Sequence, residues 1–385
     1  MGQLSIFLPP FASDYTGVCS TLFDFDCLTA INDPSCCTTH YVHYDEPRWN
    51  HQIRPIFCTA LRNIDAILGN DAKVVRAVCD AVGTLDTQMA ALVGTPVPAI
   101  TGMDMGGISR EIEALSGRVT LGFNTSGYHY YDKGIAAAGK ALFTRYAASG
   151  GRVIKNSVNI LGMTPLDYGD VGNDIALREW LENAGWRVNA NFFMGTSLDE
   201  VRRAGQAQFN LAVSAVGVVL AKYLKARFGT PWIAASPMGL EYSRTLPERI
   251  FTNRAESGYY KEARGNGLLI VTDQVIGISI REALWLAGCR RRIDVAGFFG
   301  WAPELAGQND TFLSSERHLM ELLRSGDYQS IAADPIFSHI PEVAGLKHYK
   351  ITHPAVSGRL DWKNVPQYLS QNFENLICGI ANHET

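Results

Sequence analysis

The chain has 385 residues, of which 46% are hydrophobic and 19% are charged, and its formal net charge is −4. This composition excludes a disordered chain, and the small negative charge does not favour binding to nucleic acid or to anionic membranes. Pro9 and Pro10 interrupt the apolar start, and no stretch reaches the roughly 20 apolar residues of a membrane-spanning helix. We therefore expect a soluble, cytoplasmic protein with two or three domains of roughly 100–200 residues each.

Cysteines gather towards the amino-terminal end of the chain. Six of the eight lie before residue 80 and two lie after residue 280. In a reducing compartment this clustering is more typical of metal binding or catalysis than of disulfide bridges. Cys19 follows closely on a glycine, and Cys36 and Cys37 close a turn at residues 32–35, so we expect these thiols on accessible loops. Three other cysteines are interpreted as buried structural residues: Cys79, Cys289 and Cys378.

From residue 70 onwards, short apolar runs alternate with amphipathic stretches, which is typical of parallel sheets flanked by helices. In the first part of the chain we expect strands at 89–93 and 118–123. The helices expected there, from their capping and glycine signals, span about 70–82, 105–115 and 134–148.

The same alternation continues to the end of the chain. The expected strands are 158–161, 187–193, 209–214, 267–272, 293–298 and 330–333. The expected helices are 174–184, 198–206, 218–227, 280–287 and 315–324. A polar stretch at 254–266 is interpreted as a connection. The pattern predicts an α/β protein of three Rossmann-like domains, at residues 1–150, 151–265 and 266–385.

One motif resembles a phosphate-binding loop without fitting it. Gly134, Gly139 and Lys140 have the required spacing, but Ala141 stands where Ser or Thr should hold Mg²⁺. The motif also lies in an Ala-rich helical stretch, so we expect an ordinary packed helix. No G-x-G-x-x-G follows a strand and no paired C-x-x-C occurs, so neither a nicotinamide site nor a closed zinc site is indicated.

Two loops follow neighbouring buried strands and precede helices, at residues 94–104 and 124–132. Open α/β sheets place ligands at this end of their strands. Pro96 and Pro98 stiffen the first loop, and Gly102 permits a close approach. We expect both loops to open at one edge of the sheet, and we predict that the cysteine loops reach the same edge.

Several segments of the first 135 residues occur together, in order, in one known family. These segments are G-x-C at 17–19, the turn before Cys37, D-E-P-R-W at 45–49, the run C-T-A-L-R-N-I-D from Cys58, the 94–104 loop and T-S-G-Y-H-Y-Y-D at 125–132. With them, the chain resembles the nitrogenase component 1 superfamily over nearly its whole length. Within that superfamily it looks like a β-type subunit of the nitrogenase-like reductases, among which it is most similar to methylthio-alkane reductase.

The resemblance implies that cysteines from two related subunits hold an iron–sulfur cluster at the subunit interface. The cluster would be an 8Fe–7S cluster of the P-cluster type or a 4Fe–4S cluster. By position, Cys19 is the first implied ligand and Cys37 is the second. Cys36 stands where the family usually has glycine, and it is a further candidate.

This chain departs from the family at the third ligand. The family's cysteine lies where this chain has Thr95 and Pro96. Either the chain supplies fewer ligands or another residue substitutes, and Cys58 is the obvious thiol. Ser126 lies near a position from which a serine can approach the cluster in nitrogenase β-type subunits.

The α-type subunits of the family hold a catalytic metallocofactor through a Cys at a mid-chain helix and a His near the C-terminus. In this chain the corresponding helix, 218–227, has no Cys and the stretch 357–361 has no His. The resemblance therefore implies a β-type subunit that pairs with an α-type subunit, in an α₂β₂ assembly. An ATP-dependent iron protein would deliver electrons, which the cluster would relay to the partner's cofactor.

The implied substrate reaction, in the partner subunit, is reductive carbon–sulfur cleavage of methylthio-alkanes. Three alternatives stay open at this point. The chain could be a cofactor-assembly scaffold, a tetrapyrrole reductase subunit of the same superfamily, or a cluster-free binding module whose cysteines are merely buried. A large apolar pocket at the subunit interface would favour the tetrapyrrole reductase.

Overall fold

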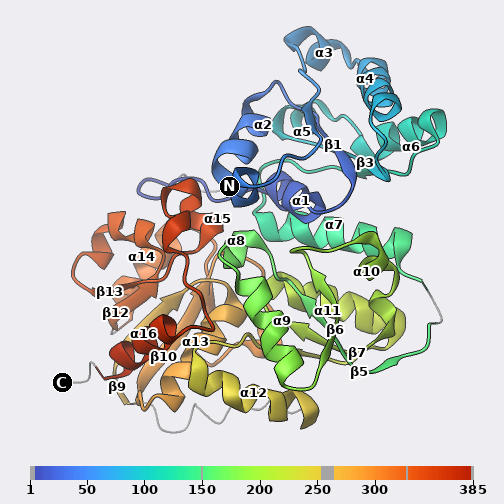
Figure 1. The fold of residues 1–385 in the computed structure, drawn as a ribbon. Helices are drawn as coiled ribbons and strands as arrows, with labels where there is room; N and C mark the ends of the chain where they lie inside the picture. Colours follow the sequence, from blue (N-terminus) through green and yellow to red (C-terminus); the bar gives the residue numbers. More distant parts are fainter. Residues whose placement is uncertain (1–4, 149–150, 253–263, 327, 383–385) are drawn as a thin grey trace.

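The computed structural model describes residues 5–148, 151–252, 264–326 and 328–382. Within these residues the chain forms three sheets, one after another along the sequence, and every pair of neighbouring strands is parallel. Sheet 1 has the order β2-β1-β3-β4, sheet 2 the order β6-β5-β7-β8, and sheet 3 the order β11-β10-β9-β12-β13. Sheet 1 and its helices form an upper lobe, with sheets 2 and 3 side by side below it (Figure 1).

The strands are short and follow the chain in order. Sheet 1 contains β1 (Cys27–Ile31), β2 (Ile56–Cys58), β3 (Met89–Val93) and β4 (Thr120–Phe123). Sheet 2 contains β5 (Ile154–Leu161), β6 (Arg187–Phe192), β7 (Ala207–Ala212) and β8 (Trp232–Ala234). Sheet 3 contains β9 (Arg264–Val271), β10 (Arg291–Gly297), β11 (Thr311–Phe312), β12 (Tyr328–Ala333) and β13 (Lys347–Lys350).

Helices connect and cover these strands. Those around sheet 1 are α1 (Asp14–Leu22), α2 (Cys36–His40), α3 (Asn63–Leu68), α4 (Asp71–Thr84), α5 (Pro96–Thr101), α6 (Met105–Ser116) and α7 (Tyr131–Tyr146). Those around sheet 2 are α8 (Pro165–Tyr168), α9 (Asn173–Asn183), α10 (Leu198–Arg202), α11 (Ala215–Phe228) and α12 (Leu240–Thr252). Those around sheet 3 are α13 (Gln274–Leu286), α14 (Glu316–Ser325), α15 (Pro354–Ser357) and α16 (Gln371–Ala381).

Local sequence explains these elements. Every residue of β1 and of β3 is buried, as expected for parallel strands covered on both faces. Helix α6 begins where the Asp104 carboxylate accepts the Gly106 N–H at 3.0 Å, and it ends at Gly117, which has a left-handed φ of 67°. Caps of this kind recur at the starts of α11 and α13, where Ser214 and Asp273 accept backbone N–H groups.

The predicted α/β class, with parallel sheets flanked by helices, is confirmed. Each sheet lies within one of the three predicted segments, although the boundaries at 150 and 265 stay predictions. Two strands before residue 70, β1 and β2, were not expected, and the expected loop at 94–104 contains the short helix α5. Most of the expected connection at 254–266 lies outside the described residues.

Two glycines allow α1 and α7 to cross at very short range. A Cβ atom on Gly17 would lie 2.0 Å from the Tyr131 carbonyl oxygen, and one on Gly134 would lie 1.8 Å from the Asp14 carbonyl oxygen. Gly134 belongs to the motif with phosphate-loop spacing, and it lies inside α7 as an ordinary packing residue, as predicted. The crossing buries all nine residues of α1.

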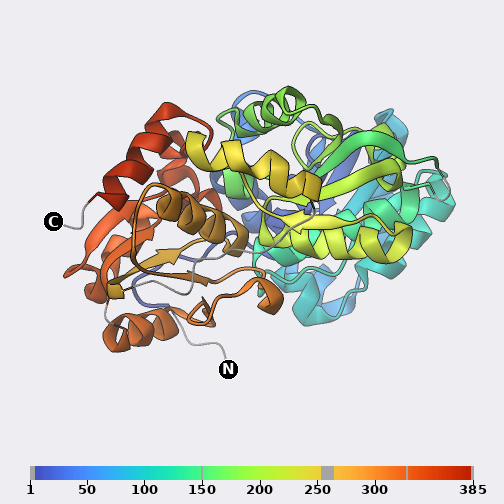
Figure 2. The same ribbon diagram turned by 90° about the horizontal axis from the view of Figure 1, so that it is seen from below.

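The unit of sheet 3 contacts both other units. Figure 2, the view from below, shows α12 running from the unit of sheet 2 towards that of sheet 3, and α12 packs there against α13 and α16. The segment before α1 packs against sheet 3's unit, where the Glu316 carboxylate accepts the N–H groups of Ile6, Phe7 and Leu8. Among the described residues, every helix falls short of the length and apolarity needed to cross a bilayer.

Candidate metal centre

The strands of sheet 1 end in one row, which sets the position of the loops that follow them. Ile31 is in register with both Cys58 and Val93, and Val93 is in register with Phe123. The chain leaves β1 in one direction to β2 and in the other to β3, so the topological switch point lies between β1 and β3. This is where open α/β sheets bind ligands. The cysteine loop after β1 thus reaches the edge shared by the loops after β3 and β4, as predicted.

The loop after β1 is organised by Asp33. One oxygen of its fully buried carboxylate, Oδ2, accepts the N–H groups of Ser35 and Thr38, at 2.9 and 3.0 Å, and so caps the start of α2. The other oxygen, Oδ1, lies 3.8 Å from the sulfur of Cys36. The ligand atoms of Asp33, Cys36 and Cys37 all lie within 4.8 Å of one another, the one such group among the described residues.

Cys58 lies at the end of β2, beside the same loop. Its sulfur is 3.1 Å from the Asp33 carbonyl oxygen, and it accepts the Ala60 N–H at 3.3 Å. Ala60 has a left-handed φ of 51°, which aims that N–H back at the sulfur. Cys36 is exposed, whereas Cys37 and Cys58 are half-buried. Three of the predicted cysteines therefore gather around the Asp33 turn.

The Cys37 thiol is held in its protonated form in the free chain. Burial, the neighbouring Asp33 carboxylate and Cys36 together raise the pKa of Cys37 to about 12, while a hydrogen bond from Tyr15 acts in the opposite direction. Metal ions bind the thiolate, so loading of a metal at Cys37 releases a proton that the empty site retains.

Cys19 does not lie on an accessible loop, so that expectation is wrong. It lies inside α1 with 0% of its surface exposed, and burial raises the pKa of its thiol well above the ordinary value. The physical reason is that Gly17 serves the close crossing of α1 with α7 instead of opening a loop. The sulfur of Cys19 is not among the ligand atoms grouped around Asp33.

Ser126 and Thr95 lie on the two neighbouring loops. The Asp14 carboxylate accepts the N–H groups of Ser126 and Gly127, at 3.0 and 2.7 Å, which fixes the loop after β4. A Cβ on Gly127 would lie 2.8 Å from Pro96, so the two loops touch. The buried Thr95 hydroxyl donates to the Asn32 carbonyl oxygen at 2.7 Å. Thr95 therefore ties the loops together and is not free to replace the family's third cysteine.

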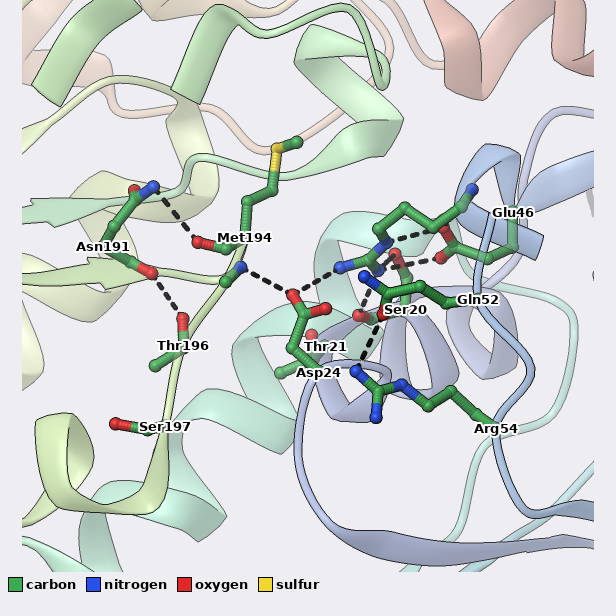
Figure 3. A network of polar contacts seen from close by, with 12 residues as sticks. Ser20, Thr21, Asp24, Glu46, Gln52, Arg54, Asn191, Met194, Thr196 and Ser197 are labelled. Carbon is green, nitrogen blue, oxygen red and sulfur yellow. Dashed lines mark hydrogen bonds and ion pairs between the residues drawn. The ribbon is translucent and has the colours of Figure 1, made fainter. Parts of the chain in front are cut away.

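Arg48, from the D-E-P-R-W segment, anchors this end of the chain to the unit of sheet 2. Its buried guanidinium donates to both carboxylate oxygens of Glu46, at 2.7 and 2.9 Å, and to the Ser20 carbonyl oxygen, at 2.7 Å. It also donates to Asp24 at 2.7 Å, and the same oxygen of Asp24 accepts the Gly195 N–H at 2.7 Å. Figure 3 shows Asp24 between the Met194–Thr196 segment and the first unit. Ser20 follows Cys19, so Arg48 fixes the helix that carries that thiol.

The family model for nitrogenase component 1 type oxidoreductases matches residues 19–263. The chain belongs to this family. The predicted resemblance to the nitrogenase component 1 superfamily is thereby confirmed.

Two curated relatives are the same component of light-independent protochlorophyllide reductase, from two organisms. The one from Chlorobium luteolum (strain DSM 273 / BCRC 81028 / 2530) is 31% identical over 250 residues, which cover 62% of this chain and 45% of the relative. The one from Nostoc punctiforme (strain ATCC 29133 / PCC 73102) is 29% identical over 164 residues, 41% of this chain and 30% of the relative. The matched stretch thus spans less than half the length of either relative.

Two solved structures, described as nitrogenase Cp1 at pH 5 and at pH 6.5, share the fold. They align with 99% of this chain and with 90% and 94% of their own, at TM-scores of 0.69 and 0.71. Their sequences are 15% and 10% identical to this one, so the likeness concerns the fold alone.

Membership of the family implies an iron–sulfur cluster, and the donors around Asp33 fit such a group. Cys36, Cys37 and Cys58 place sulfur atoms, the preferred donors for iron in clusters, at one sheet edge. The Ala60 N–H supplies a hydrogen bond to one sulfur, which is a normal way to tune a cluster. Cys19 fits only after a movement of α1. Which of the predicted residues are ligands stays a prediction.

Three residues of this site were not singled out from the sequence. Asp33 could have been found, because an Asp just ahead of a Pro-Ser turn and a short helix is a typical cap. Tyr15 and Arg48 carry no such signal, since their partners come from other segments.

Proposed function

We propose that this chain is the β-type subunit of a nitrogenase-like reductase and holds an iron–sulfur cluster jointly with a related α-type subunit. The observation that carries the proposal is the gathering of Cys36, Cys37 and Cys58 around the Asp33 turn at the switch point of sheet 1. Three thiols from one chain leave room for further ligands from a second chain. The family match supports the same conclusion.

An apolar surface beside the cysteines supports the presence of a partner. Ile67 and Leu68 on α3 are 77% and 74% exposed, and Ile100 on α5, which packs beside α3, is 72% exposed. Phe57 and Ile53, at β2, are 41% and 90% exposed. Contiguous exposed apolar residues mark interaction sites, and these elements also carry Cys58 and the loop after β3. The α-type subunit would cover this surface.

In this function the cluster accepts single electrons from an ATP-dependent iron protein and passes them to a metallocofactor in the partner subunit. The chain's own residues position the sulfurs and exclude water. Asp33 fixes the turn, Thr95 ties the neighbouring loop to it, and Arg48 holds α1 and the following segment together. The partner's cover would desolvate Cys36, which is exposed in the single chain. We place the complex in the cytoplasm, as an α₂β₂ assembly.

The curated relatives favour a tetrapyrrole as the substrate class over the methylthio-alkane that the sequence resemblance suggested. Both belong to light-independent protochlorophyllide reductases. The proposal therefore takes tetrapyrrole reduction as the first reaction to test and methylthio-alkane reduction as the second. Each is assayed with the iron protein, ATP and a reductant, on protochlorophyllide and on a methylthio-alkane in turn.

The experiment is anaerobic purification from the native host, followed by iron and sulfide analysis and identification of co-eluting chains. We expect bound iron and a co-eluting α-type chain, with loss of iron in Cys37→Ser and Cys58→Ser. Cys378→Ser, in α16, is the matched control and should retain iron. Absence of iron and of a second chain would refute the proposal. Iron without reductase activity towards either substrate would indicate an assembly scaffold.

A second experiment tests the partner surface. Ile67→Glu places a charge on the exposed face of α3 and should abolish co-elution of the α-type chain without unfolding this chain. Leu115→Glu, on α6, is the matched control because Leu115 is also 67% exposed. Equal loss of the partner in both variants would contradict the placement of the interface.

A further inference from the structure

A second hollow lies far along the chain from the cysteines, between the unit of sheet 1 and the unit of sheet 3. It has a volume of about 800 Å³ and is lined by three segments, within residues 5–11, 127–133 and 298–316. Ligand cavities in proteins typically measure roughly 300–1,000 Å³. Two of these segments follow the carboxyl ends of β4 and β10, where α/β proteins place ligands.

The walls of this cavity are aromatic and hold one another in place. The ring of Phe11 lies 5.4 Å from that of Phe298 and 5.9 Å from that of Phe299. Phe299 also meets Tyr130 edge to face at 5.5 Å. These spacings are those of favourable ring contacts, so the walls are rigid. Trp301, whose ring lies 6.4 Å from a neighbouring phenylalanine, adds a further flat surface.

The segment before α1 is fixed as a wall by Glu316. Its carboxylate accepts the N–H groups of Ile6, Phe7 and Leu8 at 2.8–2.9 Å. Although Glu316 lines the cavity, its charge is therefore already used by the backbone. A second carboxylate, that of Asp132, remains.

Asp132 is a buried carboxylate with little compensation. Its side chain is 7% exposed, and its ion-pair partner is the Lys133 ammonium at 3.4 Å. The Lys133 side chain is itself 64% exposed, so its charge is largely screened by water. Burial raises the pKa of Asp132, which shows that the surroundings stabilise its negative charge poorly. A buried carboxylate in an aromatic cavity is best satisfied by a desolvated cation.

We propose that this cavity binds a flat aromatic molecule carrying a protonated amine or amidine, whose cation pairs with Asp132 in place of Lys133. The aromatic walls stack on the flat part, and their faces attract the positive charge. An anion would meet Asp132 at close range, and a neutral ring would leave that carboxylate without a new partner. This site goes beyond the proposed function, and it does not depend on the cluster.

The experiment uses three fluorescent probes of the same three-ring shape and different charge: aminoacridine, anthracene methanol and anthracene carboxylate. Each is titrated with the purified full chain, and binding is followed by fluorescence anisotropy. We expect saturable binding of one aminoacridine per chain. Its affinity should exceed that of the neutral probe by about tenfold, as for a hydrogen bond to a charged group, and that of the anion by more. Equal or tighter binding of the anionic probe would overturn the proposal.

Variants of the two paired residues give opposite expected results. Asp132→Asn should reduce aminoacridine affinity to that of the neutral probe, while leaving binding of the neutral probe unchanged. Lys133→Met removes the competing cation, so it should tighten aminoacridine binding. Asp86→Asn removes a fully exposed carboxylate and serves as the control for net charge. Weaker aminoacridine binding in Lys133→Met would refute the assignment, even if Asp132→Asn failed to fold.

Discussion

Replacing Arg48 by Met should release α1 from its place without unfolding the whole chain. The change leaves the Glu46 carboxylate, which is 0% exposed, and the Asp24 carboxylate, which is 11% exposed, without their cation. Removing one partner of a buried ion pair costs about 3–5 kcal/mol. Because ten-fold in an equilibrium constant corresponds to about 1.4 kcal/mol, the population of locally open chain should rise about 100-fold to about 5,000-fold.

The thiol of Cys19 reports this opening. Cys19 is fully buried in α1, so it reacts with a thiol reagent only when the helix detaches. Labelling is followed by mass spectrometry of the peptide that contains Cys19. When reclosing is faster than labelling, the rate follows the open population and should rise by the same factor. Cys289, also 0% exposed but in the unit of sheet 3, should label at an unchanged rate.

A matched variant separates burial from charge. Arg145→Met breaks the pair with Glu113, whose side chain is 34% exposed while that of Arg145 is 47% exposed. A pair at this exposure contributes about 1 kcal/mol or less, so Cys19 labelling should change little. A rise of less than ten-fold in Arg48→Met, or an equal rise at Cys289, would refute the view that Arg48 anchors α1 locally.

Two further predictions follow from single residues. Gly17→Ala should lower stability by about 3 kcal/mol, because the new methyl group meets a backbone carbonyl in α7, whereas Gly83→Ala, with open space around it, should raise stability by about 0.5 kcal/mol; thermal unfolding of both variants checks this, and equal effects would contradict it. Burial and the nearby Asp167 raise the pKa of Asp273 from 3.8 to about 8. Between those values the folded chain keeps a proton that the unfolded chain releases, so this group makes stability fall as the pH rises. Asp273→Asn should flatten that decline in melting temperature measured across the window, and an unchanged slope would exclude Asp273 as its source.

The regular α/β elements could be predicted because each depends on a local pattern. Met89–Val93 is a continuous apolar run, and the structure has a strand at those same residues. The strand β1 was missed because Cys and Thr interrupt its apolar residues and it lies in a segment interpreted as loops. The strand β2 has three residues, too few for a periodic signal.

The site was predictable in part, for a different reason. Cys36, Cys37 and Cys58 were identified from spacing and from family resemblance, and strand register brings them together. The buried position of Cys19 could not be seen, because a glycine before a cysteine has the same appearance in a loop and in a helix crossing. The Asp24–Gly195 bond joins residues 171 positions apart, and no local pattern contains such a contact.

The common row in which the strands of sheet 1 end has a consequence for how metal sites diversify. Neighbouring parallel strands lie about 4.8 Å apart, close to the separation of two sulfur atoms bound to one small inorganic core. A donor lost from the loop after β3 can therefore be supplied from the tip of β2 with no change in the backbone. Ligands at such an edge are interchangeable between strands, so the set of cysteines can drift among descendants while the place that they serve is inherited intact.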